Sequence, residues 1–244
     1  MWAHPQFQAR ASLDLKTNVK RILLSWSGGK DSALALSRLR ADPDVTVVGL
    51  LTTVAAESDR VSVHGVPKNL LQQQAAALQL PLHEIVIPAI SSNEDYRAAW
   101  KLSLANLPVE LRSASHIACG DICLEDVRSY REALLNELGY ETMFPLWGES
   151  TNDIAREVLH TGFAATLVCI DTHTLPASFA GRSFDASLLH DLPPHVDPCG
   201  EHGEFHTFVS DGPGFDQPVQ FRIGCTVLEN QRFAFCNLEP VVPV

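Results

Sequence analysis

The chain contains 244 residues, of which 45% are hydrophobic and 19% are charged, so neither intrinsic disorder nor dependence on disulfide bonds is expected. Its 18 Lys and Arg residues against 29 Asp and Glu residues give a formal net charge of -11, which disfavours non-specific binding to nucleic acids. The apolar runs are far shorter than the roughly 20 residues of a membrane helix, and the 6 scattered cysteines without a secretory signal predict a reduced, cytoplasmic protein.

The first residues are set aside from the fold prediction. Trp2–Phe7 resembles streptavidin-binding affinity peptides built around His-Pro-Gln-Phe, and the periodic pattern begins only after Lys20. Residues 1–18 are therefore interpreted as an affinity tag, with a natural extension as the alternative.

From Arg21 onward, apolar strands alternate with helical patterns. Arg21–Trp26 is a short apolar run that stops at two glycines, after which apolar residues recur with helical spacing up to Leu39. The run Val45–Thr53 does not alternate, which is typical of a parallel strand buried on both faces. Further strands are predicted at 85–87 and 117–119, and further helices at 70–78, 93–107 and 125–138. This order predicts a Rossmann-like α/β fold with a doubly wound parallel sheet.

The C-terminal part differs in composition. A helix at 152–159 and a buried strand at 165–170 are followed, beyond Pro176, by sequence rich in Pro, Gly and His with short β-like runs at 204–209, 219–228 and 232–236. We therefore expect an α/β domain over residues 19–140 and a smaller α+β domain over residues 141–244.

The junction of the first strand and first helix carries the sequence Ser25-Trp26-Ser27-Gly28-Gly29-Lys30-Asp31-Ser32. This is where an α/β sheet offers its ligand crevice. Adjacent glycines let backbone amides approach an oxyanion, the helix N-terminus adds partial positive charge, and Ser27 and Ser32 supply hydroxyl donors. We interpret Ser25 and Ser27–Ser32 as a phosphate cradle, the alternative being a tight turn before a capped helix.

The cradle differs from two common nucleotide-binding motifs. The Walker loop would require Gly in place of Leu24 and Ser or Thr in place of Asp31. The dinucleotide motif G-x-G-x-x-G does not fit either, because Gly28 and Gly29 are adjacent and the next glycine is Gly49. Kinase-like NTPases and hydride-transfer enzymes are therefore not expected.

Two motifs resemble a known enzyme family. Ser27–Ser32 resembles the pyrophosphatase loop of N-type ATP pyrophosphatases, and Asp197–Thr207 resembles the C-terminal motif of the diphthine-ammonia ligase family. Further stretches similar to that family, in family order, are His64-Gly65-Val66, Gly120-Asp121-Ile122, Pro145-Leu146-Trp147-Gly148 and Ala180-Gly181-Arg182. The resemblance covers Lys20 to about Phe215 and implies an ATP-binding domain of the HUP type. It also implies a compact form without the extra C-terminal domains of eukaryotic members.

The resemblance implies an ATP-dependent ligase. A carboxylate attacks the α-phosphate to give an acyl-adenylate and pyrophosphate, and ammonia then displaces AMP. Activation is needed because an ionised carboxylate is a poor electrophile, and the cradle would stabilise the departing pyrophosphate. The implied ligands are ATP, Mg²⁺ bridging its phosphates without a dedicated protein cage, ammonia and a carboxylate acceptor. Diphthine on elongation factor 2 is the family's named acceptor, a small molecule is the alternative, and a homodimer is suggested.

Candidate residues outside the cradle lie in two places. Gly120 and Asp121 end the predicted strand 117–119 at the same sheet edge, where Asp121 would hold Mg²⁺ through water or orient the nucleotide, unless it only caps the next helix. Glu201 and Glu204 occupy a loop too polar for core packing, and they are expected to bind ammonium, accept its proton or position the substrate.

Two side chains near these glutamates are interpreted differently. His206 is a candidate for hydrogen bonding in the active site, so the predicted catalytic residues are Glu201, Glu204 and His206. Covalent sulfur chemistry at Cys199 is not expected, because no partner cysteine lies near it in the sequence.

Two other functions stay open. An RNA-modifying ATP pyrophosphatase would adenylate a base carbonyl, but the net charge of -11 and the lack of an evident basic tract argue against it. A non-catalytic sensor would bind adenine nucleotides in the same cradle, but such a protein could lose Glu201 or Glu204, and both are present.

Overall fold

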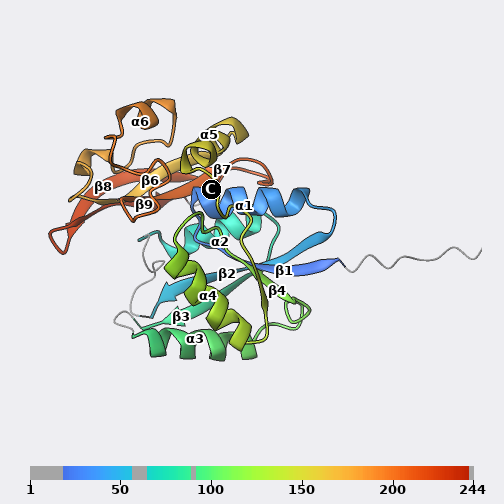
Figure 1. Cartoon of the computed structure of the whole chain (residues 1–244). Helices are drawn as coiled ribbons and strands as arrows, with labels where there is room; N and C mark the ends of the chain where they lie inside the picture. The colour runs from blue at the N-terminus through green and yellow to red at the C-terminus, as the bar shows by residue number, and fades with distance from the viewer. Residues whose placement is uncertain (1–18, 57–64, 89–91, 242–244) are drawn as a thin grey trace, which may run out of the picture.

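A computed structural model of the chain describes residues 19–56, 65–88 and 92–241. The predicted tag at residues 1–18 lies outside these ranges. The described residues form two sheets that lie one above the other, with helices on both faces of the first (Figure 1).

The first sheet has five parallel strands in the order β3-β2-β1-β4-β5. These strands are β1 Lys20–Ser25, β2 Val45–Ala55, β3 Leu82–Ile87, β4 His116–Ala118 and β5 Glu141–Met143. The helices between them are α1 Lys30–Ala41, α2 Lys68–Ala77, α3 Asn93–Ala105 and α4 Glu125–Glu137. The strand order reverses between β1 and β4, and this reversal opens a crevice at their carboxyl ends.

Side-chain alternation along β1 assigns the helices to the two faces of the sheet. Ile22 and Leu24 pack with α1 and α2, whereas Leu23 packs with α3 and α4 on the opposite face. All three side chains are fully buried, as the unbroken apolar run predicts for a central parallel strand. The predicted doubly wound sheet is therefore confirmed.

The second sheet has four antiparallel strands in the order β7-β6-β9-β8. Its strands are β6 Ala164–Asp171, β7 Phe205–Asp211, β8 Phe221–Glu229 and β9 Phe233–Pro240. The helix α5 Thr151–Thr161 leads into it, and the short helices η1 Ala177–Phe179 and α6 Ala186–Asp191 follow β6. Gly162 ends α5 in a left-handed conformation with φ of 83°, which glycine adopts without strain.

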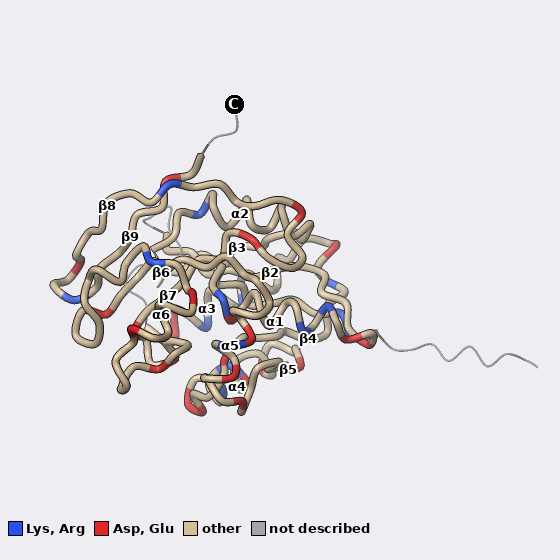
Figure 2. The backbone as a smooth tube through the Cα atoms, turned by 90° about the horizontal axis from the view of Figure 1, so that it is seen from above, with Lys and Arg blue, Asp and Glu red and all other residues tan. Residues whose placement is uncertain are grey.

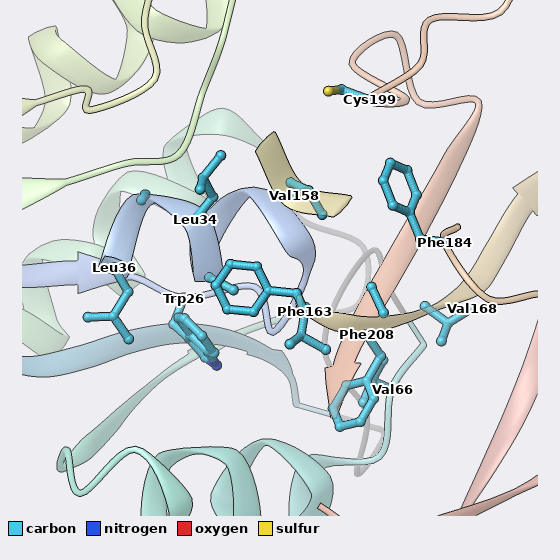
Figure 3. Close-up of a cluster of buried hydrophobic side chains, with 14 of the residues drawn as sticks. Trp26, Leu34, Leu36, Val66, Val158, Phe163, Val168, Phe184, Cys199 and Phe208 are labelled. Atoms are coloured by element: carbon cyan, nitrogen blue, oxygen red, sulfur yellow. The ribbon is translucent and has the colours of Figure 1, made fainter. Parts of the chain in front are cut away.

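One hydrophobic core joins the second sheet to the α1 and α2 face of the first. Figure 3 shows Trp26 and the α1 residue Leu34 in the same cluster as Val168 of β6 and Phe208 of β7. Because the sheets share this core, the loops at their edges are held at a fixed separation.

Charged residues of both signs occur throughout the described part of the chain (Figure 2). Figure 2 shows acidic positions among the basic ones in both halves of the chain, in keeping with the net charge of -11. Among the described residues, no helix is both long enough and apolar enough to span a membrane.

Three short elements were not predicted from the sequence, namely β5, η1 and α6. β5 pairs with β4, so residues up to Met143 contribute to the first sheet. The division into domains at residues 19–140 and 141–244 stays a prediction.

Candidate active site

The loop between β1 and α1 is ordered by its own hydroxyl groups. The amide of Gly29 donates to Ser27 Oγ over 3.2 Å, and Ser27 Oγ lies 3.2 Å from Ser32 Oγ. Ser32 Oγ donates in turn to the Gly29 carbonyl at 2.9 Å. The two serines that were predicted to bind phosphate therefore also shape the turn that presents them.

The two glycines of this loop have different tasks. Gly28 has φ of 79°, and a Cβ there would lie 2.8 Å from Gln74 Oε1, on the side of the loop that faces α2. Gly29 lines the cavity described below, and its Cβ would lie 3.0 Å from the Thr207 carbonyl oxygen. Gly28 thus provides the backbone conformation of the cradle and does not contribute to the cavity wall.

Gln74 of α2 holds the cradle from behind and is fully buried. Its Nε2 donates to the Gly28 carbonyl at 3.0 Å and to the Val209 carbonyl at 2.5 Å, while its Oε1 accepts from Trp26 Nε1 at 2.9 Å. Val209 of β7 also donates its amide to the Gly28 carbonyl at 2.9 Å. One amide side chain therefore ties the cradle to both sheets.

The end of β4 lies against the start of α1. A Cβ at Gly120 would lie 3.1 Å from the Asp31 carbonyl, so only glycine allows this approach without a shift. Asp121 does not cap the next helix, because the N-cap of α4 is Leu124, which makes no side-chain capping bond. Asp121 instead forms an ion pair with Arg131 of α4, with 3.1 Å between its Oδ2 and Nε.

The loop before β7 brings the second signature to the cradle. Lys30 donates its amide to Thr207 Oγ1 at 3.0 Å and its ammonium group to the Cys199 carbonyl. Glu201 Oε2 accepts from the amides of Ile122 and Cys123, at 3.2 and 3.4 Å. Segments that are far apart in the sequence therefore meet at the crevice between β1 and β4.

A cavity of about 220 Å³ lies where these segments meet. Its lining residues are Ser25, Ser27, Gly29, Lys30, Asp31, Ser32, Gly120, Asp121, Leu124, Arg131, Cys199, Gly200, Glu201, Gly203, Phe205, His206 and Thr207. Within the described part of the chain, five buried side-chain atoms lack a hydrogen-bond partner, and three of them belong to cavity residues, namely Asp31 Oδ1, Asp121 Oδ2 and Arg131 Nε. Asp121 Oδ2 and Arg131 Nε face each other in their ion pair, which leaves Asp31 Oδ1 as the unpaired one of the three. An unpaired buried carboxylate oxygen in a cavity wall indicates a ligand site.

Glu204 does not line the cavity and is only 4% exposed. Its two carboxylate oxygens accept from the amides of Asp197 and His202, at 3.1 and 3.0 Å. The expected direct role of Glu204 with ammonium or substrate does not match this placement, because both oxygens are used to order its own loop.

The charges around the cavity are perturbed by burial. Burial lowers the pKa of Lys30, but Asp31 and the other nearby acidic groups together more than offset this, so the pKa is raised and the amine stays protonated. Burial and the negative charge of Asp31 raise the pKa of Glu201 above its ordinary value. Burial and the neighbouring Lys30 lower the pKa of His206 to about 4, so its imidazole is neutral at neutral pH.

Lys30 also lies near two aromatic rings. Its Nζ is 5.5 Å from the centre of the Phe205 ring and 5.7 Å from that of Phe184, distances at which a ring face attracts a cation. Its ion pair with Asp31 Oδ2 measures 2.9 Å. Lys30 is thus held in one position at the start of α1.

The Cys199 thiol is poorly suited to nucleophilic chemistry. Sγ donates to the Thr151 carbonyl at 3.2 Å, and burial raises the pKa of the thiol to about 12 despite the nearby Lys30. The thiolate is the reactive form, so this environment disfavours it.

The other family-like stretches lie outside the cavity lining. Gly148 donates its amide to the Ile122 carbonyl at 2.8 Å, and Gly181 donates to the Leu167 carbonyl at 2.8 Å. Gly65 packs so closely on Phe235 that a Cβ would lie 2.6 Å from its ring. Gly65 and Gly181 thus allow close packing, whereas a Cβ at Gly148 would meet no atom within 4 Å. His64 lies outside the described residues.

Sequence reasoning missed Arg131, Gln74 and Thr207. Arg131 and Gln74 lie within ordinary helices, and no local motif distinguishes them. Thr207 is the last residue of the Asp197–Thr207 motif, so its place there was the available signal.

Comparisons with known proteins match most of the chain. The sequence model of the diphthamide synthase N-terminal domain matches residues 19–142, and that of the diphthamide synthase C-terminal domain matches residues 150–238. Proteins named diphthine--ammonia ligase from Bos taurus and Homo sapiens are each 25% identical over 227 residues, which cover 82% of this chain and 82% of the relative. The protein of that name from Schizosaccharomyces pombe is 24% identical over 209 residues, which cover 79% of this chain and 34% of the relative. The extra length expected of eukaryotic members therefore applies to the fission yeast protein and not to the two mammalian ones.

Proposed function

The chain belongs to the diphthamide synthase family, and on that premise we propose that it is an ATP-dependent ligase that joins ammonia to a carboxylate. The carboxylate attacks the α-phosphate, pyrophosphate leaves, and ammonia displaces AMP from the acyl-adenylate. The observation that carries this proposal is the cavity, because residues of the cradle and of the Asp197–Thr207 loop line it together and the buried Asp31 Oδ1 in it has no hydrogen-bond partner. The names of the relatives suggest diphthine as the acceptor.

The cradle is proposed to hold the phosphates that leave. Ser27, Gly29 and Ser32 line the cavity at the start of α1, where hydroxyl groups, backbone amides and the helix dipole favour negative charge. Lys30 supplies a fixed positive charge beside them. Since the pyrophosphate gains charge as its bond to the α-phosphate breaks, a preorganised positive site lowers the barrier.

The cavity residues are compatible with a magnesium ion that arrives with ATP. Three carboxylates, those of Asp31, Asp121 and Glu201, face two cations, so a bare triphosphate would be repelled. Asp31 Oδ1 lacks a hydrogen-bond partner and would suit such an ion. We propose that such an ion is held largely by phosphates and water. When bound, it would neutralise phosphate charge.

Glu201 is proposed as the group that accepts a proton from ammonium. It lines the cavity, and its raised pKa brings it closer to neutral pH, where a general base works best. Ammonium must lose a proton before its nitrogen can attack. Glu204 is proposed as a positioning residue that holds the loop, and neutral His206 as a hydrogen-bonding group in the wall.

Product analysis tests this function. The purified protein is incubated with ATP, Mg²⁺, ¹⁵N-ammonium and whole cell extract, and the nucleotides are separated by chromatography. We expect AMP and pyrophosphate in equal amounts, with AMP release dependent on the extract and ¹⁵N recovered in an acid-stable amide. Whether the label appears in protein or in small molecules identifies the class of acceptor.

The Gly28→Ala variant serves as the cradle control, because its Cβ would lie 2.8 Å from Gln74 Oε1 at a φ of 79°. It should lose AMP release.

For the wild-type protein, formation of ADP and phosphate would contradict adenylation. Tight ATP binding without any turnover would favour the nucleotide sensor instead.

A further inference from the structure

We propose that Arg131 is an anion-binding residue of the cavity. Its guanidinium would donate hydrogen bonds to an oxygen of the α-phosphate of ATP or of the acceptor carboxylate. Both groups present anionic oxygens to a guanidinium. The identity of these ligands rests on the proposed function.

The first support is the placement of Arg131. It lies on α4, which follows β4 at the reversal of strand order, and its side chain reaches back to the cavity wall beside Asp121. The side chain is 29% exposed, so the guanidinium is largely enclosed but open to the cavity. A guanidinium carries five donors in a planar fork that matches carboxylate and phosphate oxygens.

The second support is the incomplete pairing of this guanidinium within the protein. Nε lies 3.1 Å from Asp121 Oδ2, yet neither atom has a hydrogen bond of acceptable geometry within the described residues. Nη1 has only a weak contact of 3.7 Å with Cys119 Sγ. Nε is buried against Asp121 and is closed to a ligand, but among the described residues Nη2 has no hydrogen bond and Nη1 has only the sulfur contact, so these terminal donors can reach a ligand in the cavity.

The third support is the distribution of positive charge. Lys30 and Arg131 are the two Lys or Arg residues among the described residues that line the cavity. Lys30 already donates to Asp31 Oδ2 and to the Cys199 carbonyl, and it belongs to the cradle. A reaction between a carboxylate and a triphosphate brings two anions into one cavity, and Arg131 is the cation on the β4 and α4 side.

Arg128 provides a matched control from the same helix. Its Nε donates to Glu132 Oε1 at 2.8 Å, and its guanidinium lies 5.0 Å from the Phe144 ring centre and 4.6 Å from that of Trp147. It is not among the residues that line the cavity. Loss of Arg128 would therefore test the effect of removing an arginine from α4 without touching the proposed site.

The test compares the wild type with Arg131→Met, Arg131→Lys and Arg128→Met. Binding of Mg·ATP and of Mg·pyrophosphate is measured by calorimetry, AMP release with ammonium and whole cell extract is measured separately, and thermal unfolding checks the fold. A charge-assisted hydrogen bond is worth enough to expect a loss of about ten- to hundredfold in Arg131→Met. Arg131→Lys should recover only part of this loss, because an ammonium group lacks the planar fork of donors.

The two ligand sources give different results. Loss of ATP affinity with unchanged pyrophosphate affinity would assign Arg131 to the α-phosphate. Unchanged ATP affinity with loss of AMP release, restored by more extract, would assign it to the acceptor carboxylate. The inference is overturned if Arg131→Met matches the wild type or loses no more than Arg128→Met. A wild type that binds no ATP would overturn the proposed function as well, so the two failures are distinguishable.

Discussion

Glu201 and Glu204 belong to one loop, but their surroundings give them different tasks. Glu201 lines the cavity and reaches the amides of Ile122 and Cys123 after β4. Glu204 is buried, with both oxygens bonded to amides of its own loop. The loop composition predicted a functional role for both residues. It could not separate them, because the direction of each side chain depends on turns such as that at Gly203, where φ is 84°.

This difference predicts that substitution of Glu204 lowers mainly stability, whereas substitution of Glu201 lowers mainly activity. Glu204→Ala would leave the amides of Asp197 and His202 without partners, so we expect the free energy of unfolding to fall by about 2–4 kcal/mol. Glu201→Gln keeps the shape and an acceptor oxygen, so stability should change little while AMP release falls about 10²–10⁴-fold. Urea unfolding and AMP release are measured on both. Equal unfolding curves with loss of activity only in Glu204→Ala would reverse the assignment.

Among the secondary-structure elements, the helix α2 and the strand β7 hold the cradle in place through contacts with Gly28, which does not line the cavity. α2 contributes Gln74 and β7 contributes Val209, and both bond to the Gly28 carbonyl. The cradle conformation is therefore set by packing between the two sheets as well as by its own glycines. A local motif can predict the turn, but not the elements that fix it from behind.

Gln74→Met is expected to weaken the cradle while keeping the side-chain volume. It removes three buried hydrogen bonds, so we expect a loss of about 2–4 kcal/mol in stability. ATP affinity should fall on the order of tenfold, since binding must then also order the loop. The control is Gln72→Met on the same helix, where the exposed amide donates to Glu84 Oε1 across the surface at 3.1 Å. ATP affinities that are equal in both variants would show that Gln74 does not position the loop.

The longer elements could be predicted from local pattern, and the shorter ones could not. β1 and β2 are buried apolar runs, and α4 ends before Gly139, so periodicity and a helix stop located them. β5 has three residues and pairs with β4 alone at the sheet edge, so its strand form depends on tertiary contact. α6 has six residues and relies on a cap from Asp185 to the Leu188 amide at 2.9 Å.

At the scale of the whole molecule, the site exists because the two sheets share a core. The cradle follows β1, Asp121 follows β4, and Glu201 precedes β7, so three distant segments meet only in the folded chain. Because the carboxyl ends of parallel strands share one edge of a sheet, the sequence predicted that the cradle and Asp121 would meet there. Nothing in the sequence placed Arg131 beside them, because its position depends on how α4 packs against β4.

We propose that this cavity, between the cradle and the Asp197–Thr207 loop, holds the triphosphate of ATP. A crystal structure with Mg²⁺ and an ATP analogue whose α and β phosphates are joined by a methylene group tests it most directly. We predict that the β- and γ-phosphates lie against Ser27, Gly29 and Ser32, with the α-phosphate facing the loop that carries Glu201. A triphosphate bound elsewhere, such as in the separate cavity lined by Arg38 and Met143, would show that the cradle is not the ATP site.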